Sequence, residues 1–137
     1  MIGYLDSSVL LRWLLGEPDQ IKDLKKIEKF YSSVLIRIES KRVLHRLLKS
    51  SDITESEFEK LSKDLVELLK RVSLIEFGRS IQRRSEESFT FNIGTLDAIH
   101  LASALAIRGL DEIIFLTHDK DLARNARALD FDLLGVE

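Results

Sequence analysis

The chain has 137 residues, 45% of them hydrophobic and 32% charged, and a formal net charge of −2 at pH 7. This length predicts one domain, residues 1–137, with a core of its own. The charge argues against an indiscriminate nucleic-acid binder. No run approaches the roughly 18 apolar residues of a membrane span, and no leader precedes Ile2, so we expect no membrane association. The absence of cysteine excludes disulfides and thiolate sites, and we expect a cytoplasmic protein.

The first ten residues combine a predicted buried strand, an acid and the start of a helix. The apolar run Ile2–Leu5 predicts a short strand buried on both faces, and it stops at Asp6. Helical spacing follows, and Ser7 or Ser8 is expected to cap this helix. A carboxylate is thereby placed at the carboxyl end of a strand, where ligands bind in open parallel sheets.

The middle of the chain predicts helices that alternate with strands. Thr54 and Glu57 match a capping box, which predicts a helix that begins there and extends through Leu69. Around it, apolar periodicity predicts further elements. These are a helix over Pro18–Tyr31, a strand over Ser33–Ile36, a helix over Ile38–Lys49 and a strand over Ser73–Glu76.

The last third continues this alternation and defines the fold class. Thr95–Arg108 is rich in alanine and apolar on nearly all sides, so we expect a buried helix. The other expected elements are a polar helix from about Gly78, a strand over Glu112–Thr117, a helix over Lys120–Leu129 and a strand over Asp132–Val136. The alternation predicts an α/β fold, a three-layer α/β/α sandwich around a parallel sheet of four to five strands.

Four acidic residues recur at corresponding places in these units. Each lies at the carboxyl end of a predicted strand or the amino end of a predicted helix, so all should face one rim of the sheet: Asp6, Glu39, Asp97 and Asp119. Four unpaired carboxylates would repel one another strongly. Oxygen ligands without His or Cys suit Mg²⁺ or Mn²⁺, and such sites activate water for attack on a phosphodiester. Of the 23 acidic residues, 19 then remain elsewhere against 21 basic ones, so a polyanionic partner is compatible with the charge.

Each acid also has a purely structural explanation. Asp and Glu are favoured in the first turn of any helix, which accounts for Glu39 or Asp119 taken singly. Asp6 is harder to explain in this way because it follows a buried run. Asp97 lies on a helix with scarcely a polar face, where a carboxylate without a partner is costly to bury. Taken together, the four acids favour a site.

This arrangement resembles the PIN-domain nucleases, and most closely the VapC-type ribonuclease toxins of toxin–antitoxin pairs. The matching stretches are Leu5–Leu10, Ile36–Leu44, Leu96–Ala102 and Leu116–Ala123. The resemblance implies a PIN-like fold, metal ligation and catalysis by Asp6, Glu39, Asp97 and Asp119, and products with 5′-phosphate and 3′-hydroxyl ends. Ser7 and Thr117 match hydroxyl residues of the family pattern. Physics alone leaves Asp119 and Asp121 open as ligands, whereas the family spacing favours Asp119.

Histidine and arginine residues supply further candidates. His100 is one turn from Asp97, within reach of a hydrogen bond, and we expect it to pack or tune rather than to ligate. His118 is expected in a loop and His45 on a solvated helix face. Arg42 and Arg46 follow Glu39 at i+3 and i+7, which places them on its flank as candidate nucleic-acid contacts. A second arginine group comprises Arg79, Arg83 and Arg84.

The sequence therefore predicts a Mg²⁺- or Mn²⁺-dependent endoribonuclease, the toxin component of a type II toxin–antitoxin module. Its expected partners are an RNA substrate, a cognate antitoxin protein and a second copy of the chain. The homodimer is inferred from the predicted helices Pro18–Tyr31 and Thr54–Lys70, which carry more apolar side chains than a small sheet would cover. One alternative is a non-catalytic PIN-like module that binds RNA or protein. A small-molecule phosphohydrolase is another, without a specificity signal in the sequence.

Overall fold

Five strands form one parallel sheet in a computed structural model that describes residues 1–136. The strand order is β3-β2-β1-β4-β5, and every neighbouring pair is parallel. The strands are β1 (Ile2–Leu5), β2 (Lys29–Ser33), β3 (Val72–Ile75), β4 (Ile113–Leu116) and β5 (Asp132–Leu134). The first strand is therefore central, and its carboxyl end lies between those of β2 and β4.

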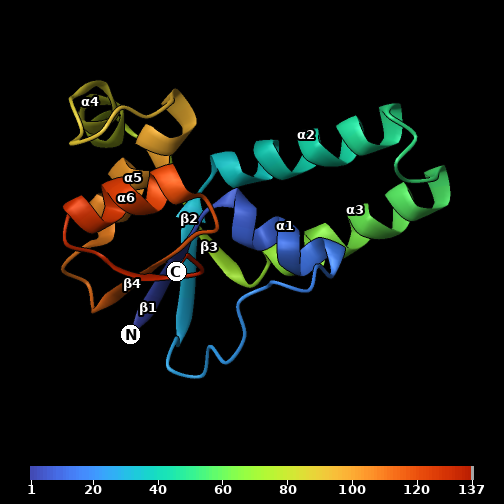
Figure 1. Cartoon of the computed structure of the whole chain (residues 1–137), viewed down its shortest axis with the longest axis horizontal. Coiled ribbons are helices and arrows are strands. Elements are labelled where there is room, and N and C mark those ends of the chain that lie inside the picture. Colours follow the sequence, from blue (N-terminus) through green and yellow to red (C-terminus); the bar gives the residue numbers. More distant parts are fainter. Residues whose placement is uncertain (137) are drawn as a thin grey trace.

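Six helices cover the two faces of this sheet (Figure 1). They are α1 (Ser7–Leu15), α2 (Leu35–Lys49), α3 (Glu55–Leu69), α4 (Arg79–Glu86), α5 (Thr95–Ile107) and α6 (Lys120–Ala128). One core cluster joins α1, α2 and α3 to the sheet, and a second joins α5 and α6 to its other face. Helix α4 packs against α5. The predicted three-layer α/β/α fold is confirmed.

The central strand explains why two cores form. Side chains alternate along a strand, so Ile2 and Tyr4 enter the core under α5 and α6, whereas Leu5 enters the core under α1. All four residues of β1 are buried, as its apolar run predicts. The strand thus ends in a fixed position, from which the chain continues at once into Asp6 and α1.

The segment before β2 differs from the prediction. No helix forms between α1 and β2 in the described chain, and the strand is Lys29–Ser33 rather than Ser33–Ile36. Phe30 and Tyr31 pair with both β1 and β3, so sheet hydrogen bonds and the strand preference of aromatic residues override the local helical spacing. The predicted helix Pro18–Tyr31 is therefore wrong. Its apolar residues Ile21, Leu24 and Ile27 pack into the core from a loop instead.

The other elements lie close to their predicted positions. Helix α2 begins at Leu35, so Glu39 is in its second turn. The capping box of α3 is confirmed, because the Glu57 N–H donates to Thr54 Oγ1 and the Thr54 N–H donates to Glu57 Oε1. Helices α2 and α3 lie side by side as an arm that extends away from the sheet (Figure 1). Within residues 1–136 no helix has both the length and the apolar character needed to cross a bilayer.

Candidate functional site

The four predicted acids come to one rim of the sheet, at the carboxyl ends of the central strands. Asp6 follows β1, and Asp119 precedes α6 by one residue. Glu39 is in the second turn of α2, and Asp97 is in the first turn of α5. The charges of Asp119, Asp6 and Glu39 all act to raise the pKa of Asp97. Four separate segments of the chain therefore bring their carboxylates within electrostatic reach of one another.

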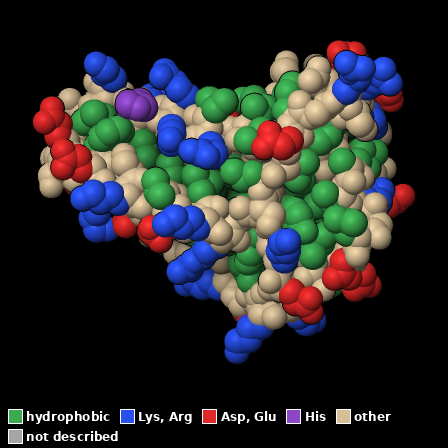
Figure 2. All heavy atoms as spheres, turned by 180° about the vertical axis from the view of Figure 1, so that it is seen from behind, with side chains coloured by type: hydrophobic (Ala, Val, Ile, Leu, Met, Phe, Trp, Pro, Cys, Tyr) green, Lys and Arg blue, Asp and Glu red, His purple; other side chains and the backbone are tan. Residues whose placement is uncertain are grey.

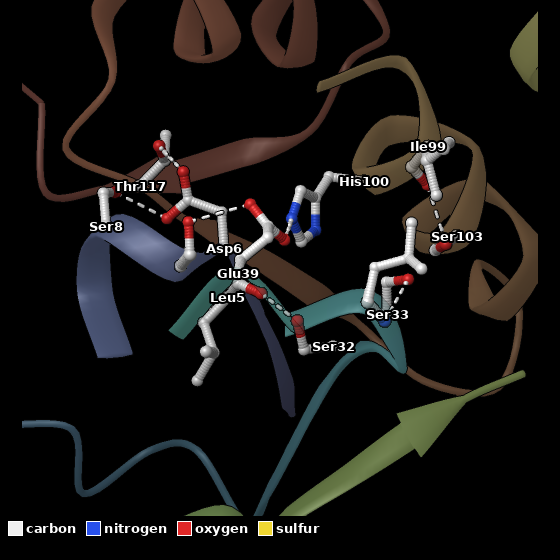
Figure 3. Close-up of polar contacts among 12 residues, drawn as sticks. Leu5, Asp6, Ser8, Ser32, Ser33, Glu39, Ile99, His100, Ser103 and Thr117 are labelled. Atoms are coloured by element: carbon white, nitrogen blue, oxygen red, sulfur yellow. Dashed lines mark hydrogen bonds and ion pairs between the residues drawn. The ribbon is translucent and has the colours of Figure 1, made fainter. Parts of the chain in front are cut away.

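Asp6 is the most completely enclosed of these acids, with only 4% of its surface exposed. Its Oδ1 accepts hydrogen bonds from Ser8 Oγ at 2.6 Å and from the Val9 N–H at 3.3 Å. Its Oδ2 accepts one from Thr117 Oγ1 at 2.7 Å (Figure 3). Burial raises the pKa of Asp6, against the opposing effects of His100 and these donors. Asp6 itself caps α1, so the predicted cap at Ser7 or Ser8 is wrong.

Glu39 is held by a hydrogen bond on each carboxylate oxygen. Ser7 Oγ donates to its Oε2 at 3.0 Å, and His100 Nε2 lies 2.7 Å from its Oε1 (Figure 3). The His100 side chain is only 2% exposed, and its Nδ1 lies 2.7 Å from Tyr4 Oη. His100 thus serves Glu39 rather than Asp97, its predicted hydrogen-bond partner. Burial opposes a charge on His100, but the bonded Glu39 carboxylate and the charges of Asp6 and Asp97 together outweigh burial and raise the pKa of the imidazole.

The carboxylates of Asp97 and Asp119 have fewer partners. Asp119 Oδ1 accepts a hydrogen bond from the Leu122 N–H at 2.9 Å, which caps α6. No side chain or backbone group among residues 1–136 donates a hydrogen bond to the Asp97 carboxylate. Burial, followed by the charge of Asp119, raises the pKa of Asp97 to about 6. A cation bound nearby would therefore stabilise the ionised carboxylate of Asp97.

Two secondary candidates contact the acids directly, and a third does not. Ser7 bonds to Glu39, and Thr117 donates to Asp6 while accepting from the Asp119 N–H at 3.0 Å. The exposed Asp121 lies in the first turn of α6 and bonds to Asn125 through its backbone carbonyl. Asp119 has the largest charge effect on the pKa of Asp97, which it raises. This proximity in charge favours Asp119 over Asp121.

The fit of this rim to a divalent cation depends on how its donors are placed. Within residues 1–136, no three His, Asp or Glu side chains are placed so that they could hold a metal ion as they stand. The predicted cage of four converged carboxylates is therefore not formed among the described residues. The chemistry nevertheless suits Mg²⁺ or Mn²⁺, because the rim offers only oxygen donors and crowds negative charge around a half-buried Asp97.

A groove of about 310 Å³ begins at Glu39 and follows α2. Arg42 and Arg46 line it together with Glu39, so the predicted placement of these arginines on the flank of Glu39 is confirmed. Much of the remaining lining is apolar, and Ile38 and Leu96 are 61% and 49% exposed. The groove thus combines apolar walls with two cations beside the acidic rim. By contrast, Arg84 of the second arginine group packs over Phe89, at 4.3 Å from the ring centre.

One residue of the site, Tyr4, was not assigned to it from the sequence, and Ser8 was expected there as a helix cap or a neighbour of the metal. Tyr4 lies in the central strand, where its ring is buried and its hydroxyl reaches His100. Ser8 donates to Asp6 and accepts from the His118 N–H at 2.9 Å. The one available signal was the phenol in an otherwise aliphatic strand, since a buried tyrosine hydroxyl needs a partner. His118 is in a loop and His45 is exposed, both as predicted.

The chain is similar to known proteins both in sequence pattern and in structure. The sequence profile of the PIN domain family matches residues 3–128. No curated protein sequence matches the chain. The chain is similar in structure to VapBC2 from Rickettsia felis, solved bound to a promoter DNA fragment, with 18% identity, 98% of each chain covered and a TM-score of 0.69.

Two further solved structures show the same fold. A protein from Pyrobaculum aerophilum is 17% identical over 91% of this chain and 84% of that one, with a TM-score of 0.60. VapBC-1 from nontypeable Haemophilus influenzae is 13% identical over 98% of this chain and 97% of that one, with a TM-score of 0.58.

Proposed function

Because this chain belongs to the PIN domain family, we propose that it is an endoribonuclease that hydrolyses RNA phosphodiester bonds with the help of Mg²⁺ or Mn²⁺. The observation that carries the proposal is the acidic rim, where Asp119, Asp6 and Glu39 all raise the pKa of Asp97. Carboxylates held this close together repel one another and do not stabilise the fold. They can serve catalysis if their charge attracts a cation and, with it, a phosphate.

In this proposal Asp97 and Asp119 bind the cation together with Asp6. A bound divalent ion lowers the pKa of water and neutralises charge that develops on the phosphate oxygens. Glu39 either joins the ligands or orients the attacking water. Ser8 and Thr117 fix the Asp6 carboxylate through hydrogen bonds of 2.6 and 2.7 Å, so this acid needs no reorganisation when substrate enters.

Arg42 and Arg46 are proposed to bind the RNA backbone. Both line the groove that ends at Glu39, and arginine donors match phosphate geometry. A competing role is to neutralise the acids while no cation is bound. A third explanation is that both are ordinary solvated residues of α2. RNA binding across a salt series, measured together with Mn²⁺ affinity, distinguishes the three.

We further infer that the protein is the toxin of a type II toxin–antitoxin module. Two of the similar structures are named as VapBC proteins, which supports a small antitoxin protein as the partner. The groove beside Glu39 offers such a partner exposed apolar residues, Ile38 and Leu96, next to cationic ones. An inhibitor that lies there would cover the acidic rim.

We propose a homodimer from the apolar surface of the protein, since the helix predicted over Pro18–Tyr31 does not form. Figure 2 shows hydrophobic side chains gathered across the middle of the face opposite to that in Figure 1. Contiguous exposed apolar surface commonly marks an interface.

The proposed activity is tested with purified protein and RNA of mixed sequence. We expect cleavage with Mg²⁺ or Mn²⁺, complete loss of cleavage with EDTA, and products with 5′-phosphate ends. Asp97→Asn, purified in parallel, controls for contaminating nucleases and should be inactive. Equal cleavage in EDTA would refute the proposal. RNA binding without cleavage would instead identify a non-catalytic PIN-like module.

A further inference from the structure

A chain of hydrogen bonds leads from the backbone of β2 to the carboxylate of Glu39. The Ser33 N–H donates to Tyr4 Oη at 3.1 Å. Tyr4 Oη lies 2.7 Å from His100 Nδ1, and His100 Nε2 lies 2.7 Å from Glu39 Oε1. Both rings are buried, with Tyr4 at 0% and His100 at 2% exposure. The chain thus links three different elements, β2, β1 and α5, to one acid of the rim.

The direction of these bonds follows from the available donors and acceptors. The Ser33 N–H can only donate, so Tyr4 Oη accepts from it and keeps its own proton for another group. His100 Nδ1, at 2.7 Å, is positioned to accept that proton. Neutral imidazole that accepts at Nδ1 must carry its hydrogen at Nε2, which faces Glu39 Oε1. While His100 is neutral, Tyr4 thus favours the tautomer in which His100 donates to Glu39.

Packing fixes the two rings as firmly as the hydrogen bonds do. Tyr4 stacks on Phe115 with ring centres 5.2 Å apart, and it meets His100 edge-on at 5.8 Å. Neither ring can turn without opening the core between β1 and α5. His100 therefore holds its Nε2–H in one place, and Ser7 holds the other oxygen of Glu39 at 3.0 Å.

We propose that Tyr4 and His100 are positioning residues that hold Glu39 to orient the attacking water. This inference rests on the proposed function. Each carboxylate oxygen can accept two hydrogen bonds, and one position on each is already taken. Glu39 therefore retains one free position on each oxygen, so a water molecule can bind there while Ser7 and His100 stay in place.

Substitutions of His100 and Tyr4 should lower the rate of the chemical step without weakening cation binding. His100→Leu removes the donor while filling most of the space, and kcat should fall roughly 10–100-fold, the usual effect of losing a partner that orients a reacting group. KM for RNA and Kd for Mn²⁺ should change less than about threefold. His100→Gln, whose amide N–H can replace Nε2–H, should recover most of the lost kcat, and Tyr4→Phe should lose less than His100→Leu.

Ile99→Ala is the matched control. Ile99 precedes His100 on the same helix, is 6% exposed and packs with Ile81 of α4. It lies apart from Glu39 (Figure 3). This variant should lower the melting temperature and leave kcat unchanged. Equal kcat losses in Ile99→Ala and His100→Leu would overturn the inference, because they would reflect core damage. A parallel loss of Mn²⁺ affinity in His100→Leu would also overturn it, because Glu39 would then act as a ligand.

Nitrogen-15 NMR of the wild-type protein tests the hydrogen-bond chain without any cation or substrate. We expect neutral His100 to carry its proton at Nε2 and not at Nδ1, and the opposite tautomer would overturn the inference. If wild-type protein with Mg²⁺ or Mn²⁺ cleaves no RNA, the proposed function fails. If it cleaves and His100→Leu cleaves equally fast, only the present inference fails.

Discussion

The acids of the rim form two pairs that differ in how they are held. The inner pair, Asp6 and Glu39, is fixed by side-chain donors on both oxygens of each carboxylate. The outer pair, Asp97 and Asp119, receives a single hydrogen bond within residues 1–136, from the Leu122 N–H to Asp119. This difference suggests that the fold itself positions the inner pair, whereas a cation completes the arrangement of the outer pair. It also explains why no ready set of three ligands is found among the described residues.

The same substitution made in each pair tests whether the inner and outer pairs differ in how they affect stability. Asp6→Ala and Asp97→Ala should both reduce RNA cleavage by roughly 10³-fold, because each removes charge stabilisation at the reacting phosphate. Their stabilities should diverge. Asp6→Ala leaves Ser8, Thr117 and the Val9 N–H without their acceptor and should lower the free energy of unfolding by about 2 kcal/mol.

Asp97→Ala breaks no hydrogen bond and relieves repulsion. It should therefore raise the free energy of unfolding of the cation-free protein at pH 7 by about 1 kcal/mol, a value discounted for solvent screening of this half-buried group. Denaturant unfolding in EDTA measures both variants. Equal destabilisation by the two substitutions would contradict the division into inner and outer pairs.

The pH dependence of stability should identify the strained acid of the outer pair. The pKa of Asp97 is raised from 3.8 in the unfolded chain to about 6 in the folded protein. Between these values the folded state binds more protons than the unfolded state, so stability falls as pH rises. The loss begins near pH 4, is complete slightly above pH 6, and is absent below pH 4.

Unfolding free energies of wild type and Asp97→Ala, measured in EDTA between pH 4 and 7, test this expectation. The advantage of Asp97→Ala should grow to about 1 kcal/mol across this range and then remain constant. Subtracting one curve from the other removes most of the contributions of Asp6 and His100. A difference that does not change with pH would show that Asp97 is not strained in the folded protein.

How much of this site the sequence could predict depends on how local each signal is. The positions of Asp6, Asp97 and Asp119 follow from strand ends and helix starts, which short-range patterns reveal. The loop before β2 was missed because pairing of Phe30 and Tyr31 with two other strands decides their conformation. The hydrogen bond between Tyr4 and His100 joins residues 96 positions apart, and the local periodicity of the sequence cannot predict such a contact.

The smallest predicted effects concern the groove rather than the acids. Arg42→Ala and Arg46→Ala, made in an inactive Asp97→Asn background, should each weaken RNA binding a few-fold and reduce the slope of log affinity against log salt by about 0.7. Arg37→Ala is the matched control, because Arg37 is exposed on the same helix and does not line the groove. Unchanged RNA binding with altered Mn²⁺ affinity would assign the arginines to charge neutralisation, and no change in either would make them solvated surface residues.

Crystals grown with Mn²⁺ and measured for anomalous scattering would show whether this rim binds a divalent cation, as we propose. We expect a peak bordered by the carboxylates of Asp6, Asp97 and Asp119, with Asp6 and Glu39 retaining the hydrogen bonds described above and Asp97 turned toward the ion. The absence of a peak at saturating Mn²⁺, or a peak held by residues away from this rim, would contradict the proposal.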